Sequence, residues 1–233
     1  IDNFSGGRPE NIAHLKGEDR FDFREMDICE HDALAGAMRN VDRVFHIAGI
    51  GDIVPSIEAP LDYHRANVDG TVSCLEAARA NGVSRFLYAA SSTCYGLAEF
   101  YPTPEDHPIS PEYPYALTKY MGEELVLHWA HVYGLSATSL RLFNVYGPRS
   151  RTTGAYGAVF GVFLAQKLAG KPYTVVGDGE QTRDFTYVSD VADAFFTVSE
   201  SDIPGEALNV GSGGSYSINR LVDLLGGEKM YIP

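Results

Sequence analysis

Tyr115 and Lys119 are the residues of this chain whose types and spacing most directly suggest chemistry. Positions four apart share a face of a helix, and the segment 114–133 is predicted to be a helix that ends at Gly134. A lysine ammonium beside a tyrosine hydroxyl lowers the pKa of the tyrosine, so such a pair can take and return a proton near neutral pH. Taken alone, the spacing is a weak signal. The chain has 14 tyrosines, so a lysine falls four residues after one of them fairly often by chance, and a surface lysine near a packed tyrosine is the more common case.

Three consecutive hydroxyl residues mark the end of the strand-like segment 84–91. Ser91, Ser92 and Thr93 stand at its carboxyl end, and this edge is where ligands bind in open α/β sheets. A hydroxyl there can hydrogen-bond an alcohol or carbonyl of a substrate. A capping or turn cluster has the same composition, so this alternative stays open.

Two further polar residues follow later strand-like segments. Asn144 comes directly after the segment 136–143, and Arg183 follows a Gly-Asp-Gly turn. A guanidinium can clamp an anionic group through charge-assisted hydrogen bonds, although a lone arginine more often forms a structural ion pair.

The elements that must position these side chains alternate along the sequence. Strands are predicted at 21–28, 41–48, 84–91, 136–143, 172–176 and 208–210, and helices at 32–38, 60–81, 114–133, 158–169, 188–199 and 217–225. This alternation implies right-handed crossovers, and hence an α/β fold with a doubly wound parallel sheet. The polar segment 149–157 is predicted to be a loop over a pocket.

The composition argues against several classes of protein. Acidic residues number 31 and basic residues 18, which gives a net charge of −13 and disfavours binding to nucleic acid or to an anionic membrane. No run of about 18 apolar residues is present, so no transmembrane helix is expected. Three cysteines are odd in number and sparse, which favours a reducing compartment over a disulfide framework.

Two other reactive residue types are present without the partners that their chemistry needs. His128 and His131 lie three apart on a predicted helix, but no cysteine or second histidine pair completes a zinc set. We therefore expect a solvated helix face and no metal. Cys94 lies near the hydroxyl cluster without an evident base, which favours a small packed residue over a nucleophile.

In combination and in this order, the motifs are specific. They are Ile1-Asp2-Asn3, His46-Ile47-Ala48-Gly49, and the segments 67–71, 91–96, 115–119, 141–148 and 179–185. Over nearly its whole length the chain resembles the extended short-chain dehydrogenase/reductase family, in its nucleotide-sugar epimerase and dehydratase branch. The resemblance implies a Rossmann-like NAD-binding domain over 1–147. It also implies a smaller lobe over 148–233 that mainly binds substrate and is interleaved with the sheet domain.

The resemblance also implies roles for single residues. Tyr115 would be the catalytic acid/base, Lys119 would hold the nicotinamide ribose and depress the pKa of Tyr115, and Ser91 would bond the reacting hydroxyl. Asp2 would bind the adenosine ribose of NAD and disfavour the extra phosphate of NADP. Other cofactor contacts would come from Asp27, Ile28, Ala48, Gly49 and Asn67, and substrate contacts from Ser92, Thr93, Asn144 and Arg183.

One position bears on the reaction. Dehydratases of this branch place an acidic residue two positions before the tyrosine that here is Tyr95, whereas this chain has Thr93, preceded by Ser92. The resemblance therefore implies an NAD-dependent 4-epimerase that works through a 4-keto sugar, with a dehydratase or decarboxylase as the alternative. A non-catalytic dinucleotide-binding or scaffold protein is the alternative of another class.

The resemblance finally implies partners and an incomplete chain. The substrate would be a nucleotide sugar, expected to be a UDP-sugar chosen partly by the loop 149–156. A second copy would pack through two helices near 60–81 and 114–133, and the location would be cytoplasmic. The family's first strand and glycine-rich loop precede Ile1 and are missing, and the lobe ends early. We interpret the sequence as a fragment, or as a truncated relative that no longer binds NAD.

Overall fold

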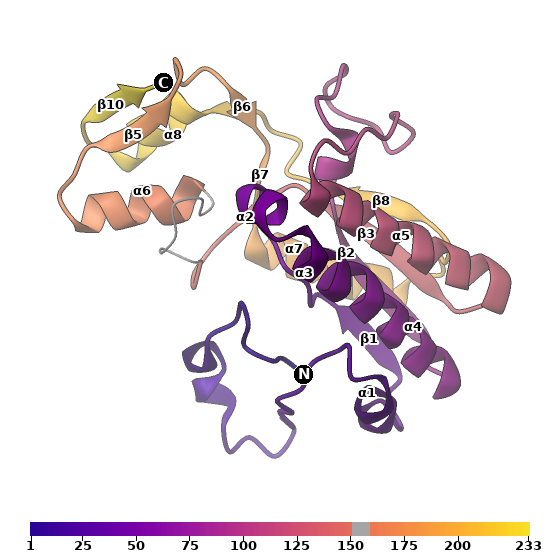
Figure 1. Cartoon of the computed structure of the whole chain (residues 1–233). Helices are drawn as coiled ribbons and strands as arrows, with labels where there is room; N and C mark the ends of the chain where they lie inside the picture. The colour runs from indigo at the N-terminus through magenta and orange to yellow at the C-terminus, as the bar shows by residue number, and fades with distance from the viewer. Residues whose placement is uncertain (151–158) are drawn as a thin grey trace. The chain divides into compact units, whose positions relative to one another are not determined.

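The computed structural model describes residues 1–150 and 159–233 (Figure 1). The chain forms two compact units. The first comprises Ile1–Arg141 and Phe195–Asn209, and the second comprises Leu142–Ala194 and Val210–Pro233.

A four-stranded sheet organises the first unit. Its order is β1 (Arg43–His46), β2 (Arg85–Ser91), β3 (Ala137–Leu142) and β8 (Ala207–Val210). Strands β1 and β2 are parallel, with Arg43 opposite Arg85 and His46 opposite Tyr88. Every residue of β2 is buried, which explains why its sequence between Arg85 and Ser91 is a continuous apolar run and does not alternate.

Helices cover both faces of this sheet, as the doubly wound fold requires. Helix α1 (His31–Ala37), α4 (Gly70–Ala80) and α5 (Pro114–Tyr133) pack with Phe86, Tyr88 and Ala90 of β2 in one apolar core. Phe45 points to the other face, where its ring lies 6.2 Å and 5.9 Å from Phe195 and Phe196 of α7 (Val188–Glu200). The predicted fold class is thereby confirmed (Figure 1).

The helix predicted at 60–81 is interrupted. It consists of α3 (Pro60–His64), a π-helical turn η3 (Arg65–Asp69) and α4, and an unpredicted helix α2 (Ile53–Glu58) precedes it. The Thr71 hydroxyl donates to the Asn67 carbonyl at 2.7 Å. Because this bond competes with the backbone for the same acceptor, it favours a locally widened turn.

The strand predicted at 21–28 is wrong. The structure has only an isolated parallel bridge between Asp2 and Glu25 there. The Phe4 N–H donates to the Asp2 carboxylate at 2.7 Å, and Phe4 has a φ of 54°. This tight turn leads the partner segment away after one residue, so the ladder cannot extend. Two short 3₁₀ turns, η1 (Pro9–Asn11) and η2 (Ala13–Leu15), follow.

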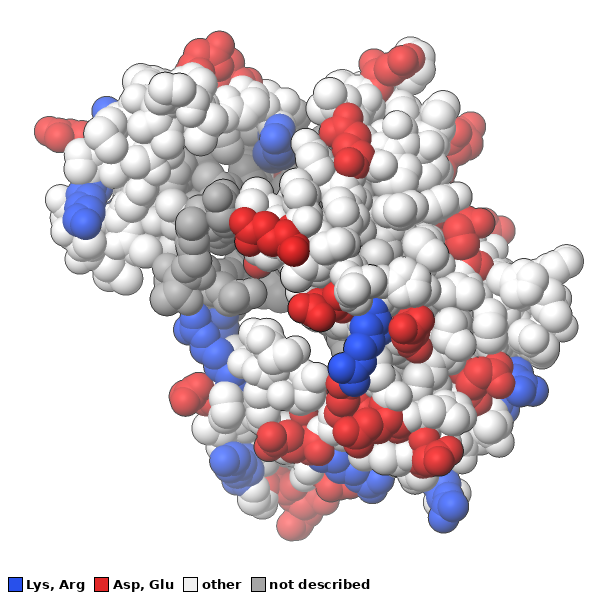
Figure 2. Space-filling view, viewed as in Figure 1, with Lys and Arg blue, Asp and Glu red and all other residues white. Residues whose placement is uncertain are grey.

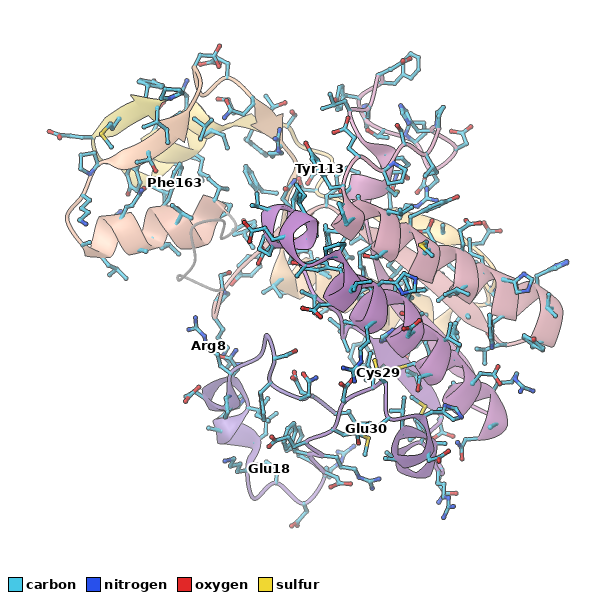
Figure 3. The ribbon with its side chains drawn as sticks, in the orientation of Figure 1. Arg8, Glu18, Cys29, Glu30, Tyr113 and Phe163 are labelled. Atoms are coloured by element: carbon cyan, nitrogen blue, oxygen red, sulfur yellow. The ribbon has the colours of Figure 1, made fainter. Side chains whose placement is uncertain are left out.

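The second unit has its own small core. Strand β5 (Tyr173–Val176) pairs in parallel with β10 (Lys229–Ile232). Helices α6 (Val159–Leu168) and α8 (Ile218–Leu225) pack on them through Phe163, Tyr173 and Val222. Figure 3 labels Phe163 on α6, and its ring lies 5.1 Å from that of Tyr173. Residue 158, the first of the predicted helix 158–169, lies outside the described residues.

Short strand pairs, which the sequence did not predict, complete the second unit. Strand β4 (Asn144–Tyr146) runs parallel to β7 (Phe185–Tyr187), and β6 (Thr182–Arg183) is antiparallel to β9 (Tyr216–Ser217). Of the predicted loop at 149–157, residues 151–157 lie outside the described part of the chain.

The surface reflects the composition. Figure 2 shows acidic side chains spread more widely than basic ones over the visible face. Within the described residues, no helix combines the length and apolar character needed to cross a membrane. All three cysteines are free.

Candidate active site

Strand β2 and helix α5 carry the three predicted catalytic residues. Ser91 ends β2, Tyr115 lies in the first turn of α5 and Lys119 in the next turn. Pro114 starts the helix, where its fixed φ is compatible with helical geometry and its missing N–H is not needed. The Ser91 hydroxyl is hydrogen-bonded to Tyr115 and accepts from the Thr93 hydroxyl at 2.9 Å. The structure therefore assembles a serine, a tyrosine and a threonine hydroxyl at the carboxyl end of a buried strand.

The predicted lowering of the pKa of Tyr115 is wrong for this structure. Burial raises the pKa of Tyr115, the hydrogen bond from Ser91 opposes this, and the Asp52 carboxylate raises it further. Lys119 does not offset these effects, because its ammonium lies over the ring of Tyr88, 4.3 Å from the centroid. The phenol is consequently protonated at neutral pH.

Lys119 itself is almost completely buried, with 6% of its surface exposed. Burial lowers the pKa of Lys119 to about 7, and the Glu123 carboxylate one turn further along α5 opposes this effect. The charge of Lys119 is thus poised near neutral pH, where a change in its surroundings decides between ammonium and amine.

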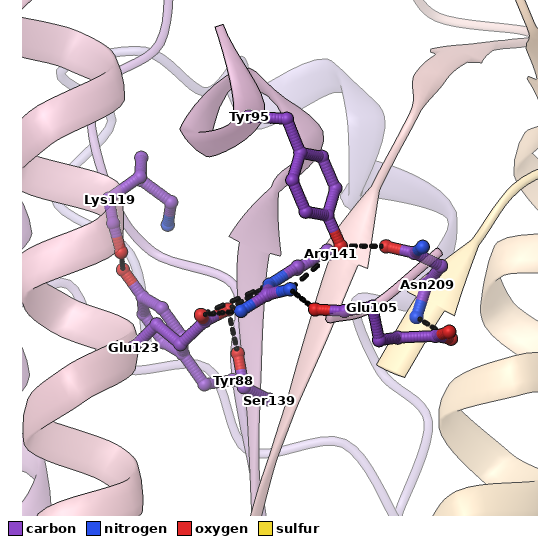
Figure 4. Close-up of polar contacts among 8 residues, drawn as sticks. All are labelled: Tyr88, Tyr95, Glu105, Lys119, Glu123, Ser139, Arg141 and Asn209. Carbon is purple, nitrogen blue, oxygen red and sulfur yellow. Dashed lines mark hydrogen bonds and ion pairs between the residues drawn. The ribbon is translucent and has the colours of Figure 1, made fainter. Parts of the chain in front are cut away.

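Glu123 belongs to a buried ionic network (Figure 4). Arg141 donates to its carboxylate from Nη2 at 2.7 Å and from Nε at 3.0 Å, and Ser139 donates at 3.0 Å. Arg141 Nη1 also donates to the Tyr95 hydroxyl at 2.7 Å. Because each charge is paired and hydrogen-bonded, the network can sit in the core behind Lys119 and hold α5 against β3.

Asn67 clamps the loop that follows β1. Its amide donates to the Ile50 carbonyl and to the Thr118 hydroxyl, both at 3.1 Å, and its oxygen accepts from the Ile50 N–H at 2.8 Å. A Cβ on Gly49 would lie 2.7 Å from the Asn67 Oδ1 and 3.7 Å from the Lys119 Nζ. The backbone of Gly49 therefore lies close to both the Asn67 side chain and the Lys119 ammonium, with no room for a larger residue. Ala48, beside it, is half-buried.

The residues predicted near the adenosine end are held by local contacts. Asp2 makes the turn with Phe4 described above. The Asp27 carboxylate accepts from the Cys29 N–H at 2.9 Å and pairs with Arg65 at 3.1 Å. Ile28 packs against Gly70, where a Cβ would come within 2.6 Å of it. Asp2 thus keeps an exposed carboxylate, whereas Ile28 faces the core.

In the second unit, Asn144 and Arg183 line one pocket of about 430 Å³. Its other walls are mainly apolar and include Phe160 and Phe185, whose rings lie 5.1 Å apart. Asn144 is held by two bonds to the Asp184 carbonyl, from its backbone N–H at 3.2 Å and its side-chain amide at 2.9 Å. An apolar pocket with a guanidinium and an amide at its wall is suited to a ligand that combines a flat ring with an anionic group.

Several residues that shape the site were missed by the sequence reasoning. Glu123 had a usable signal, because it stands four residues after Lys119 on a predicted helix. Tyr88 and Thr118 had none, because periodicity indicates which face of an element a residue occupies but not what it meets there. In the described part of the chain, no group of three or more His, Cys, Asp or Glu is arranged to hold a metal ion.

The fold and the site define a class of protein. A doubly wound parallel sheet with a serine at a strand end, and a tyrosine and lysine four apart on the adjoining helix, has the architecture of a short-chain dehydrogenase/reductase.

Comparison with known proteins specifies the family. The model of the NAD dependent epimerase/dehydratase family matches residues 1–211. A UDP-glucose 4-epimerase of Mycolicibacterium smegmatis is 35% identical over 230 residues, covering 97% of this chain and 73% of the relative. UDP-glucuronic acid decarboxylase 1 of Arabidopsis thaliana is 33% identical over 230 residues, covering 97% and 51%.

A solved structure agrees. It is a UDP-N-acetylglucosamine 4-epimerase from Methanobrevibacter ruminantium in complex with UDP-N-acetylmuramic acid. It superposes with a TM-score of 0.94 at 33% identity, covering 100% of this chain and 76% of that chain. The chain belongs to the NAD-dependent epimerase/dehydratase family, and its cofactor is NAD.

Proposed function

We propose that this protein is an NAD-dependent 4-epimerase of a UDP-sugar. The observation that carries the proposal is the hydroxyl set around Ser91, which joins Tyr115 and Thr93. Positions 92 and 93 are serine and threonine, so this set lacks the carboxylate that would drive loss of water from a 4-keto sugar. A site that can only move a proton on and off one oxygen favours oxidation and return at the same carbon.

The residues of the chain divide the work of the reaction. NAD, when bound, supplies the acceptor and donor of a hydride at C4. Tyr115 takes the proton of the C4 hydroxyl and later returns it, while Ser91 holds the same oxygen. Because burial and Asp52 raise the pKa of Tyr115, the phenolate requires a positive charge beside it. In the structure the Lys119 ammonium lies over the ring of Tyr88. Lys119, one turn along α5, is proposed to supply the charge when NAD is bound, and it can do so only as the ammonium, so its protonation state controls the reaction.

The two ends of the bound molecules are assigned to different residues. Asp2, Asp27 and Ile28 are proposed for the adenosine end of NAD, and Ala48, Gly49 and Asn67 for its nicotinamide end. The lack of room for a Cβ at Gly49 supports the second assignment, since a bare backbone beside Lys119 permits close approach of a flat ring. Ser92 and Thr93 are proposed for the sugar, and Asn144 and Arg183 for the diphosphate. On this proposal the segment 1–147 mainly binds NAD, and 148–233 mainly binds substrate.

The test is turnover of a panel of UDP-sugars by the purified protein with NAD. The panel contains UDP-glucose, UDP-N-acetylglucosamine and UDP-glucuronate, and products are separated by chromatography and weighed by mass spectrometry. A product of unchanged mass and altered retention supports the epimerase and names its sugar. A product lighter by one water or one carbon dioxide would refute the interpretation of Thr93 in favour of a dehydratase or decarboxylase. NAD binding without any product favours the non-catalytic alternative.

The proposal includes a cytoplasmic homodimer. Leu117, Val132 and Tyr133 leave 46%, 51% and 50% of their surfaces exposed on α5, and Leu61 on α3 leaves 82% exposed. Apolar side chains along two neighbouring helices support a helical interface with a second copy. The three free cysteines fit a reducing compartment. Light scattering of the purified protein measures the mass, and a monomer at micromolar concentration would contradict the dimer.

A further inference from the structure

Tyr88 contacts both ends of the Lys119 residue. The face of its ring lies 4.3 Å from the Lys119 ammonium, and its hydroxyl donates to the Lys119 carbonyl at 3.3 Å (Figure 4). Tyr88 has no exposed surface. It fits beneath α5 only because position 122 is glycine, where a Cβ would lie 2.3 Å from the tyrosine oxygen. The position of the ring is therefore fixed by packing.

Among the described residues, the titratable groups that act electrostatically on Lys119 or on Tyr115, or on which Lys119 acts, include Glu123 on α5, His46 on β1 and Asp52 in the loop after β1. Burial lowers the pKa of His46 to about 3, with a further contribution from Lys119, so His46 is neutral. Asp52 raises the pKa of Tyr115, and a protonated Tyr115 carries no charge.

Glu123 is the one carboxylate that acts on Lys119 among these groups, and its charge is already paired. Both of its oxygens accept from Arg141, so the carboxylate is only a partial counter-charge for the lysine. The remaining attraction comes from the electron-rich face of an aromatic ring in a place from which water is excluded.

We propose that Tyr88 is a positioning residue that keeps Lys119 in its ammonium form, through the face of its ring. The inference rests on the proposed function, in which the positive charge of Lys119 stabilises the phenolate of Tyr115. Exclusion of water strengthens a cation–π contact. At such a site, loss of the contact with Tyr88 is large enough to lower the pKa of Lys119 by about one pH unit. Since burial already lowers the pKa of Lys119 to about 7, this difference decides the charge at neutral pH.

The experiment titrates Lys119 in the protein without NAD, so it is independent of turnover. Lysine is labelled with ¹³C at Cε, and the signal of Lys119 is assigned by its loss in Lys119→Met. Spectra are recorded from pH 5 to 10 for the wild type, Tyr88→Phe, Tyr88→Leu and the control Phe86→Leu. Phe86 is equally buried on the same face of β2 and belongs to the same core, so its truncation leaves a comparable cavity.

The expected result is a specific loss in one variant. Tyr88→Leu lowers the midpoint of Lys119 by about one pH unit, whereas Tyr88→Phe and Phe86→Leu stay close to the wild type. An unchanged midpoint in Tyr88→Leu overturns the proposal. An equal fall in Tyr88→Phe also overturns it, because the hydroxyl would then be responsible, and an equal fall in Phe86→Leu would show a general packing effect.

A second series keeps the shape of the ring and guards against a Tyr88→Leu variant that does not fold. Phenylalanine carrying one, two or three fluorine atoms is placed at position 88, because fluorine withdraws charge from the ring face with little change in volume. The midpoint of Lys119 should fall stepwise with each fluorine, and a flat series would overturn the proposal. The same series also separates this inference from the proposed function: a stepwise fall without any UDP-sugar turnover would uphold Tyr88 and reject the epimerase.

Discussion

Gly122→Ala tests how closely α5 packs on β2. An alanine in the middle of a helix is favoured over glycine by about 1 kcal/mol, so helix propensity alone predicts a more stable protein. The added Cβ would lie 2.3 Å and 2.8 Å from two ring-end atoms of Tyr88 and 3.1 Å from the Asn67 carbonyl oxygen. Tyr88 is completely buried, and overpacking of this kind costs typically 1–3 kcal/mol. With both contacts below 3.0 Å, we place the steric cost near 3 kcal/mol and the net loss near 2 kcal/mol.

Gly36→Ala is the matched control. Gly36 also lies in a helix, α1, but nothing is within 4 Å of its added Cβ. Propensity then acts alone, and the variant should gain about 0.5–1 kcal/mol. Urea unfolding followed by circular dichroism measures both free energies. For a chain of this size, a loss near 2 kcal/mol corresponds to a fall in Tm of roughly 4–8 °C. A Gly122→Ala protein as stable as the wild type would refute the close approach of α5 to Tyr88.

Three further predictions concern the site. Tyr115→Phe should reduce epimerase turnover by at least about 10²-fold with the circular dichroism spectrum retained, and unchanged turnover would remove Tyr115 from the mechanism. The pKa of Lys119 is about 7 in the folded protein and about 10.4 unfolded, so the unfolded chain binds more protons between these values and stability should rise with pH there. From pH 7 to 8.5 the gain is about 1.5 kcal/mol in urea unfolding of the wild type. Lys119→Met should lose this gain, and an equal gain in both proteins would contradict the burial of the ammonium. Arg183→Ala should weaken UDP binding about tenfold or more in calorimetry, whereas Arg220→Ala, which removes an exposed arginine of α8, should not, and equal losses would indicate a general charge effect.

The sequence predicted most of the long elements correctly. Helix α5 begins and ends at the expected residues, because Pro114 and Gly134 mark its ends. Helices α1 and α8 and strands β2 and β5 are shifted by one residue at most at either end. Signals of this kind depend only on a few neighbouring residues, so they predict the ends of an element without knowledge of what packs against it.

The short strands and the expected strand 21–28 show where local signals stop. Strands β4, β6, β7 and β9 have two or three residues each, and they exist because a partner lies beside them. The segment 21–28 has the composition of a strand but only one paired residue. A strand is completed by hydrogen bonds to another segment, and sequence composition does not specify that segment.

The sequence alone determined the identity and spacing of the chemical groups. Ser91, Tyr115 and Lys119 stand at a strand end and on one helix face whatever surrounds them, and these positions follow from the periods of strand and helix. Only the tertiary structure decided their protonation. The pKa of Tyr115 is raised and that of Lys119 lowered because burial penalises the charged form of each group. The ammonium of Lys119 also meets the ring of Tyr88, which comes from β2. Burial and the approach of a distant strand are properties of packing, and a pKa depends on both.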